Sequence, residues 1–281
     1  MPRVCILTDS TVHFTSPNFL GHDLVSVLPM RISLDQMTYS DGQGINPGKL
    51  PDSARNDHNL DVLPPSEDAF IAALDSISRE CSHVLVILHS AQLSPTIASA
   101  HQIVAAHHVP AEVHIIDSQT IGVGLGMVIQ AAAHAIISGA SISEIKPMLH
   151  RLIPRVYTIY CTQSLTYLIH SGQLDPAQAV VGEMLGLAPF FTLENGHLVP
   201  IQKAKSSRNM LDIFEEFISE FSGLEHIAVF QGTPLFNGEM RNLRERIREQ
   251  YHHTSYSEHT LTAVTGALLG PRSMGIVTLV S

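Results

Sequence analysis

Short apolar runs alternate with helical repeats along the first half of the chain. The short, branched and uninterrupted run at 84–88 predicts a buried strand, and apolar runs that end in polar turns predict two more at 4–11 and 112–120. Apolar side chains at helical spacing predict helices at 64–81, 95–104, 122–139 and 141–152. The last of these opens with a capping box, Ser141 and Glu144. This alternation predicts parallel strands joined by right-handed crossovers, with helices on both faces of one sheet.

Two stretches interrupt the alternation. The apolar run at 24–34 is broken by Pro29, and residues 38–61 are rich in Gly, Pro, Asn and Asp. Such a composition is typical of a long loop or of a small, poorly regular subdomain, which we place at about 25–62. Loops of this length in compact proteins are often functional, or they cover something.

The pattern changes after residue 155. Asn195-Gly196 lies between two apolar arms at 189–202 and is the strongest short hairpin signal in the chain. Further strands are predicted at 156–164 and 226–232, and helices at 206–221 and 239–250. The predicted fold class is α/β with two domains. A parallel, Rossmann-like domain spans 1–155, and an α+β domain with an antiparallel hairpin spans 156–281.

Three predicted strands of the first domain end in hydroxyl-rich turns. These turns are Asp9-Ser10-Thr11, the segment from Ser90 to Ser94, and Asp117-Ser118. Ligands of parallel sheets bind beyond the carboxyl ends of the strands. Ser94 is a good helix N-cap, and Pro95 suits the first helical position. Free N–H groups of that helix and the hydroxyls would suit an anionic head group. The alternative is structural, with Ser94 only capping a helix and Asp9 only capping a turn.

Composition narrows the classes of function. Of 281 residues, 44% are hydrophobic and 15% charged, so the chain is not disordered. The formal charge of −10 disfavours nucleic acid and anionic membranes as partners. The helix at 239–250 carries four arginines, but three glutamates alternate with them, which predicts a solvated amphipathic helix; a partner-binding face is the alternative. No apolar stretch is long enough for a membrane span or a signal peptide, so we expect a cytoplasmic protein.

Few residues show the spacing of a metal or nucleophile motif. The cysteines Cys5, Cys81 and Cys161 are odd in number and far apart, which argues against a disulfide framework, and we expect Cys5 and Cys81 to be buried small hydrophobes. The pairs His107-His108 and His252-His253 are placed at polar helix ends, and no metal site is predicted there. "GVGLGM" at 122–127 fits a dinucleotide fingerprint poorly, and its glycines are better explained by close helix packing.

Six stretches together resemble a known family. "LTDSTVHF", "YSDG", "LHSAQLSPTIASA", "VHIIDSQTIGVGLGMVIQAA", "SLTYLIHSGQL" and "GPRSMG" follow one another as they do in the DegV family. The resemblance spans nearly the whole chain. It implies a bacterial lipid-binding protein that holds a long-chain fatty acid, such as palmitate, in a tunnel between two α/β domains. It also implies presentation of the carboxylate to the ATP-binding subunit of a fatty acid kinase, with no cofactor and no catalysis by this chain.

The resemblance carries over unevenly to the head-group residues. Ser94 keeps the family's head-group serine, but Pro95 stands in place of a glycine. Val62 stands where the family has a carboxylate-binding threonine, and Leu268 where it has a histidine. Arg272 replaces a glycine, so it either pairs with a carboxylate or is a solvated loop residue. The family's basic kinase-docking segment, which carries an Arg-Gly, is also altered at 203–208.

The sequence therefore predicts a lipid-binding protein. Ser94 would bond the head group, with Ser10, Ser90 and Thr96 nearby, and Val62 and Leu268 would line the pocket beside Arg272. A hydrolase is the rival interpretation, with His89 as a base beside Ser90. A third interpretation is a scaffold protein whose tunnel has collapsed.

Overall fold

A parallel sheet forms the centre of the first domain. The computed structural model describes residues 3–51, 59–170, 172–204, 206–233 and 237–281. In sheet order the parallel strands are β2 (Val25–Leu28), β1 (Val4–Asp9), β6 (His83–Leu88) and β7 (Glu112–Asp117). The branched apolar side chains of the two central strands, β1 and β6, are buried on both faces, whereas the edge strands β2 and β7 are partly exposed, with Val27 46% exposed.

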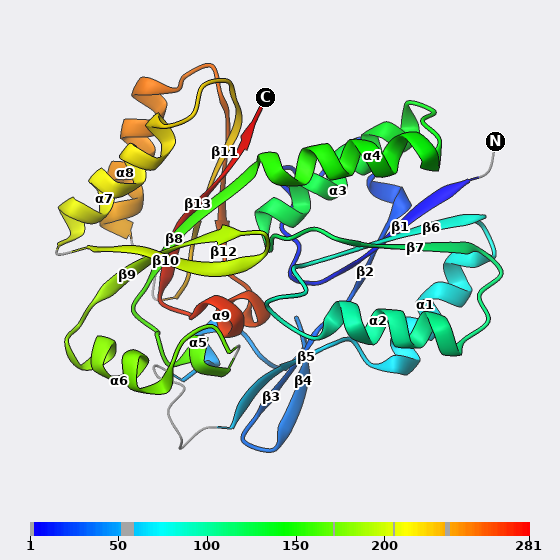
Figure 1. The fold of residues 1–281 in the computed structure, drawn as a ribbon, viewed down its shortest axis with the longest axis horizontal. Helices are drawn as coiled ribbons and strands as arrows, with labels where there is room; N and C mark the ends of the chain where they lie inside the picture. The colour runs from blue at the N-terminus through cyan, green and yellow to red at the C-terminus, as the bar shows by residue number, and fades with distance from the viewer. Residues whose placement is uncertain (1–2, 52–58, 171, 205, 234–236) are drawn as a thin grey trace.

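Helices cover both faces of this sheet (Figure 1). The helices α1 (Glu67–Ser78) and α2 (Thr96–Ala106) pack on one face, and α3 (Val123–Ile137) and α4 (Ile142–Leu152) on the other. The predicted capping box at Ser141 and Glu144 is present. Gly126 permits close packing of α3, because a Cβ there would lie 2.0 Å from the carbonyl oxygen of His13.

The second domain is built on a six-stranded sheet. Its strands in sheet order are β10 (His197–Ala204), β9 (Ala188–Glu194), β8 (Val156–Thr162), β13 (Ser273–Val280), β11 (Leu224–Gln231) and β12 (Ser255–Thr260). Neighbouring strands are antiparallel except β11 and β12, which run parallel. Asn195 and Gly196 form the β9–β10 turn with φ of 49° and 83°, which confirms the predicted hairpin. The proposed domain boundary after residue 155 coincides with the start of β8.

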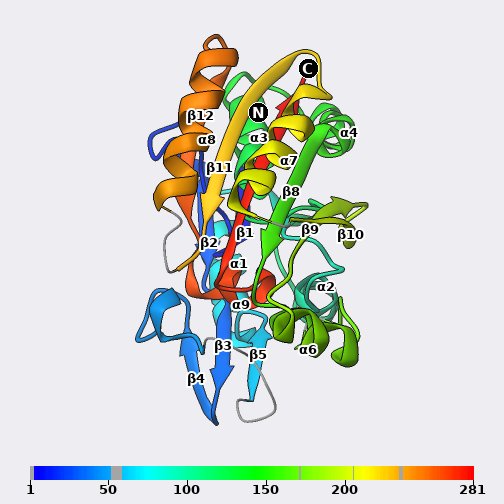
Figure 2. The ribbon, with the colours of Figure 1, turned by 90° about the vertical axis from the view of Figure 1, so that its left-hand side faces the viewer.

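Two sets of helices enclose this second sheet. The helices α7 (Ser207–Ser219) and α8 (Asn237–Gln250) pack on its outer face (Figure 2). On the inner face are α5 (Tyr167–His170), α6 (Pro176–Met184) and α9 (Ala263–Leu269). The stripe Met240, Leu243 and Ile247 of α8 is buried, and Arg244 and Arg246 pair with acidic residues of the same domain. These contacts favour the amphipathic-helix interpretation.

The loop-rich region contains a regular sheet of its own. The strands β3 (Arg31–Leu34), β4 (Met37–Ser40) and β5 (Leu60–Leu63) form a small antiparallel sheet. Asp35 and Gln36 join β3 to β4 with positive φ angles of 49° and 69°, so this hairpin turn lacks the glycine that sequence patterns rely on. Short 3₁₀ turns at His22–Leu24, Pro47–Lys49 and Ile153–Arg155 complete the connections.

The cysteine prediction is wrong for one pair. Cys5 on β1 and Cys81, just before β6, are joined by a disulfide with a Cα–Cα distance of 6.0 Å. The two residues are 76 positions apart, and only the pairing of β1 with β6 brings them together. Cys161 is free and buried. Among the described helices, none is both long and apolar enough to cross a membrane.

Candidate functional site at the strand ends

The polar turns of β1 and β6 meet at the carboxyl end of the parallel sheet. Asp9 ends β1, and His89 follows β6 directly. The backbone N–H of His89 donates to Asp9 Oδ2 at 2.9 Å, and both side chains are fully buried. Adjacent parallel strands thus bring together two residues that are 80 positions apart in the sequence.

A chain of hydrogen bonds runs from Asp9 through His89 to Ser94. His89 Nδ1 lies 2.9 Å from Asp9 Oδ2, and His89 Nε2 lies 2.6 Å from Ser94 Oγ. Burial raises the pKa of Asp9, but the charge of His89 and hydrogen bonds from His89 and Thr11 outweigh it, so the net shift is downward. An ionised Asp9 accepts a hydrogen bond from His89 Nδ1, and His89 Nε2 is left within hydrogen-bond distance of the Ser94 hydroxyl.

Ser94 is held from its other side by the start of α2. Its Oγ lies 2.7 Å from Thr96 Oγ1, and the backbone N–H of Thr96 donates to it at 3.3 Å. The helix begins at Thr96 with Pro95 in the N-cap position, one residue later than predicted. Ser94 nevertheless accepts from the first N–H of the helix, so its predicted association with the helix start is retained.

Ser94 opens into a groove of about 510 Å³ between the small sheet and α9. Two residues that the sequence places beside the head group, Val62 and Leu268, line this groove. The remaining lining is mostly apolar and includes Leu60, Leu63, Ala91, Leu93, Pro95 and Ala267. Asp61 and Gln92 add polar groups. The groove therefore joins one hydroxyl to an apolar surface.

Three other predicted residues are directed elsewhere. Ser10 Oγ donates to Asp41 Oδ2 at 2.7 Å, and Ser90 Oγ donates to the carbonyl of Gly196 at 2.9 Å. Both hydroxyls thus hold segments of the fold together. The prediction that Arg272 pairs with a head group is not supported, because its guanidinium donates to Gln163 Oε1 at 2.8 Å and lies outside the groove lining. Thr96 is buried beneath Ser94.

A second, narrow cavity lies between the two domains. It measures about 20 Å³, close to the volume of one water molecule, and its lining is apolar apart from a few groups. His13 Nε2, Thr158 Oγ1 and Tyr160 Oη face this region, are buried, and lack hydrogen-bond partners among the described residues. Leu269 and Thr265 of α9 line it, whereas Leu268 of the same helix lines the open groove.

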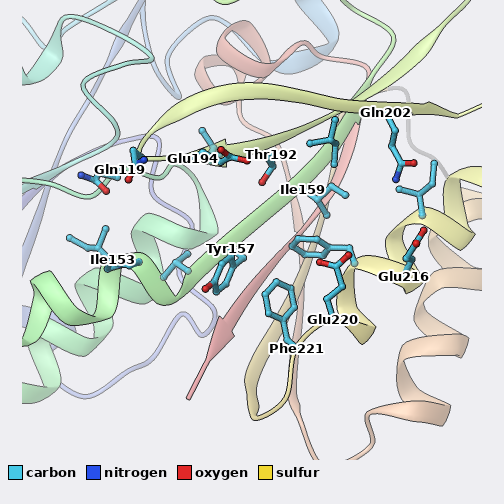
Figure 3. A pocket seen from close by; sticks show the side chains of 17 residues that line it. Gln119, Ile153, Tyr157, Ile159, Thr192, Glu194, Gln202, Glu216, Glu220 and Phe221 are labelled. Atoms are coloured by element: carbon cyan, nitrogen blue, oxygen red, sulfur yellow. The ribbon is translucent and has the colours of Figure 1, made fainter.

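A larger groove of about 700 Å³ lies on the outer side of the second sheet (Figure 3). Most of its lining comes from β8, the β9–β10 hairpin and α7, with Gln119, Ile153 and Pro154 added by the first domain, and it includes Glu194, Glu216 and Glu220. Carboxylates from both sides disfavour an anionic ligand there. The chemistry predicted for an anionic head group therefore fits the smaller groove at Ser94 better.

Sequence and structure comparisons place this geometry in a family. The model of a family described as "Uncharacterised protein, DegV family" matches residues 3–280. The chain belongs to the DegV family. A DegV domain-containing protein of Staphylococcus aureus is 27% identical over 282 residues, with 99% of each chain covered.

Solved DegV structures share the fold. A DegV family protein from Thermus thermophilus, whose structure is described as showing fatty acid binding, superposes with a TM-score of 0.84 at 24% identity, over 99% of this chain and all of that one. The fatty acid kinase (Fak) B3 protein of Streptococcus pneumoniae, solved with linoleic acid, gives 0.80 at 15% identity, over 99% of this chain and all of that one. These likenesses confirm the predicted two-domain α/β fold.

The structure also reveals a positioning role that the sequence did not predict. The sequence indicates His89 only as a base beside Ser90, yet it bonds to Ser94, five residues along the chain. Asp41, within the motif "YSDG", bonds to Ser10 and was assigned no role. Its pKa is raised by burial, against the hydrogen bond from Ser10. Both residues act through tertiary contacts that their local sequence does not signal.

Proposed function

We propose that this protein binds a long-chain fatty acid with the carboxylate at Ser94 and the acyl chain on the apolar surface behind it. The observation that carries the proposal is the groove that joins the Ser94 hydroxyl to Leu93, Val62 and Leu268. Membership of the DegV family and the fatty-acid ligands of its solved members support the same ligand class.

The physical balance of such a site is favourable. Each buried methylene contributes about 0.8 kcal/mol, so a long acyl chain gives a large gross gain. A carboxylate removed from water costs several kcal/mol unless it is hydrogen-bonded. Ser94 and the first turn of α2 offer donors at that point, and a helix N-terminus favours negative charge. The narrow interdomain cavity would have to widen to admit an acyl chain. This agrees with the buried polar atoms of its lining, which lack hydrogen-bond partners among the described residues.

The bonds from Asp9 to Ser94 have the connectivity of a hydrolase triad. In many serine hydrolases the backbone N–H after the nucleophile stabilises the oxyanion, and here that residue is Pro95, which has no N–H. We therefore propose that the chain orients the Ser94 hydroxyl for binding. Covalent labelling of Ser94 by a fluorophosphonate, lost in Ser94→Ala, would instead favour the hydrolase.

We further propose that the bound carboxylate is presented to a kinase subunit that carries ATP. The Fak B3 relative supports this role by its name. In this chain the segment at 203–208 lies where β10 leads into α7, with residue 205 outside the described residues. Its departure from the family pattern predicts that the partner, if present, differs in its docking contacts.

Mass spectrometry of an organic extract of the purified protein tests the binding proposal. We expect one fatty acid per chain, and weaker binding of added palmitate by about tenfold or more in Ser94→Ala, equivalent to one hydrogen bond to a charged group. Ser99→Ala, on the same helix and outside the groove lining, is the matched control.

A gain-of-function variant sharpens the test. Val62→Thr restores a hydroxyl of nearly the same shape at the groove and should tighten palmitate binding several-fold, by about 1 kcal/mol. A neutral lipid in the extract, with no response of its binding to Val62→Thr, would show that the head group is not a carboxylate. A protein that stays empty and refuses added fatty acid would contradict the proposal.

A further inference from the structure

Three side chains of the types that bind metal ions lie close together at the end of the parallel sheet opposite Ser94. His83 begins β6 and Glu112 begins β7, and the two residues are register partners across adjacent strands. His114 follows Glu112 by two positions, so both side chains project from the same face of β7. That face is covered by α3 and α4.

The distances among these side chains suit a shared ion better than hydrogen bonds. His83 Nδ1 lies 3.4 Å from Glu112 Oε2, and His114 Nε2 lies 3.4 Å from Glu112 Oε1. Two ligands on one tetrahedral zinc ion, each bonded at 2.0–2.1 Å, are about 3.4 Å apart. The candidate ligand atoms all lie within 4.8 Å of one another. The imidazole rings are nearly parallel, with an interplanar angle of 18°.

The two nitrogen atoms are also unsatisfied. His83 Nδ1 and His114 Nε2 are buried and have no hydrogen-bond partner within the described part of the chain. Buried polar atoms without partners are uncommon in native proteins and call for an explanation such as an ion or water. Both atoms are directed toward the Glu112 carboxylate, whose side chain is 65% exposed and leaves the cluster open to solvent.

We infer that His83, Glu112 and His114 form a binding site for a divalent transition-metal ion, with zinc the best match. Two imidazoles and one carboxylate are a known zinc ligand set, which leaves a fourth position for water. Calcium and magnesium prefer oxygen ligands throughout, so they fit this donor set poorly. The site lies away from the Ser94 groove and differs from the sequence-based expectation of no metal site.

The surrounding charges set the conditions for binding. Lys146 on α4 lies close enough to His114 to act on it electrostatically, and its positive charge opposes a bound cation. A neutral imidazole is the form that binds metal. A bound ion would link the first residues of β6 to edge strand β7 and stabilise the first domain by mass action.

Metal titration of the chelator-treated full chain tests this inference. Cobalt(II) should produce the visible absorption of a low-coordinate site with one equivalent bound, and zinc should displace it. A competition assay with a chromophoric chelator then gives the zinc Kd. We expect His114→Gln to weaken zinc binding by about tenfold or more, and the double variant His83→Gln/His114→Gln to abolish it. Lys146→Met should tighten binding by about two- to fivefold.

The control is the adjacent pair His252 and His253, whose ring centroids are 4.0 Å apart. The double variant His252→Gln/His253→Gln should bind zinc as the parent does. Unfolding in chelator should give the same Tm for all variants, and zinc should raise the Tm only where His83 and His114 are intact. Absence of stoichiometric zinc binding at micromolar concentrations would overturn the inference. Unchanged binding in the His83→Gln/His114→Gln variant would also overturn it.

Discussion

The two faces of strand β8 are built from different chemistry. Ile159 and Cys161 point to the outer face, where they pack with Phe214 and Met274 under α7. Thr158 and Tyr160 point to the inner face, beside the narrow cavity between the domains. Burial raises the pKa of the Cys161 thiol to about 12, which makes it an inert apolar group. On the inner face, Thr158 Oγ1 and Tyr160 Oη are buried without partners among the described residues.

This difference separates stability from binding. A face filled with apolar side chains in contact contributes hydrophobic stabilisation and tolerates little change. A face with unsatisfied hydroxyls forgoes some of that stabilisation, because each such group costs about 1–3 kcal/mol. A cost of this kind is reasonable where a ligand or water occupies the region part of the time. The inner face belongs to the same apolar cluster as Leu93 and Leu268 of the Ser94 groove.

The largest expected effect comes from the outer face. Ile159→Ala should lower the free energy of unfolding by about 2–5 kcal/mol, because it removes a fully buried side chain and leaves a cavity. Urea unfolding measures the loss, and palmitate titration of the folded variant should give the parent's affinity. A large loss of palmitate affinity would show that the two faces are coupled, and the comparison would fail.

A smaller loss of folding stability is expected when the pH falls, because His13 lies beside the cavity on the inner face. Burial and the nearby His259 lower the pKa of His13 to about 4. Because the folded pKa lies below the unfolded value of 6.5, stability is complete above that value and is lost as pH falls toward 4. At pH 5 the loss from His13 is about 2 kcal/mol. His226, whose pKa is also lowered to about 4 by burial and His259, adds to the acid sensitivity.

Urea unfolding at pH 7 and pH 5 checks this prediction. His13→Leu should reduce the difference between the two free energies of unfolding by about 2 kcal/mol. His134→Gln, on the exposed side of α3, should leave the difference unchanged. An unaltered difference in His13→Leu would show that His13 is protonated as readily in the folded chain as in the unfolded chain.

Local patterns in the sequence predict the fold well. Buried runs specify the parallel strands, and Asn195-Gly196 specifies the hairpin because its two positive φ angles are costly for most other residues. The turn at Asp35 and Gln36 also has positive φ angles, but these residue types do not predict such a turn from the sequence. The sequence therefore does not predict the small antiparallel sheet of the loop-rich region.

The sequence predicts which residues lie at the candidate site, but not the partners that their side chains take. Ser94, Val62 and Leu268 lie together as the sequence indicates. The bond from Asp9 to His89 crosses 80 positions and depends on which strands are neighbours. The direction of Arg272 depends on its contact with Gln163, 109 residues away. Spacing along a chain says which residues end strands, but it does not say which partner each side chain takes.

The smallest expected effect distinguishes the two faces most directly. Tyr160→Phe removes only the inner-face hydroxyl, which burial already keeps neutral by raising its pKa. Without ligand, the variant should be as stable as the parent or more stable by up to about 1 kcal/mol, because an unpaired buried hydroxyl is lost and the ring is kept. Matched urea unfolding of the conservative outer-face variant Ile159→Val should show a loss of about 0.5–1.5 kcal/mol.

Adding palmitate turns this pair into a test of what the inner face is for. If a ligand or an ordered water pairs with Tyr160 Oη when the cavity widens, the advantage of Tyr160→Phe should disappear in the loaded protein, and its palmitate Kd should rise. Ile159→Val should respond to palmitate as the parent does. A Tyr160→Phe variant that is less stable than the parent even without ligand would mean that the hydroxyl already has a partner, and the inner face would then be an ordinary satisfied core.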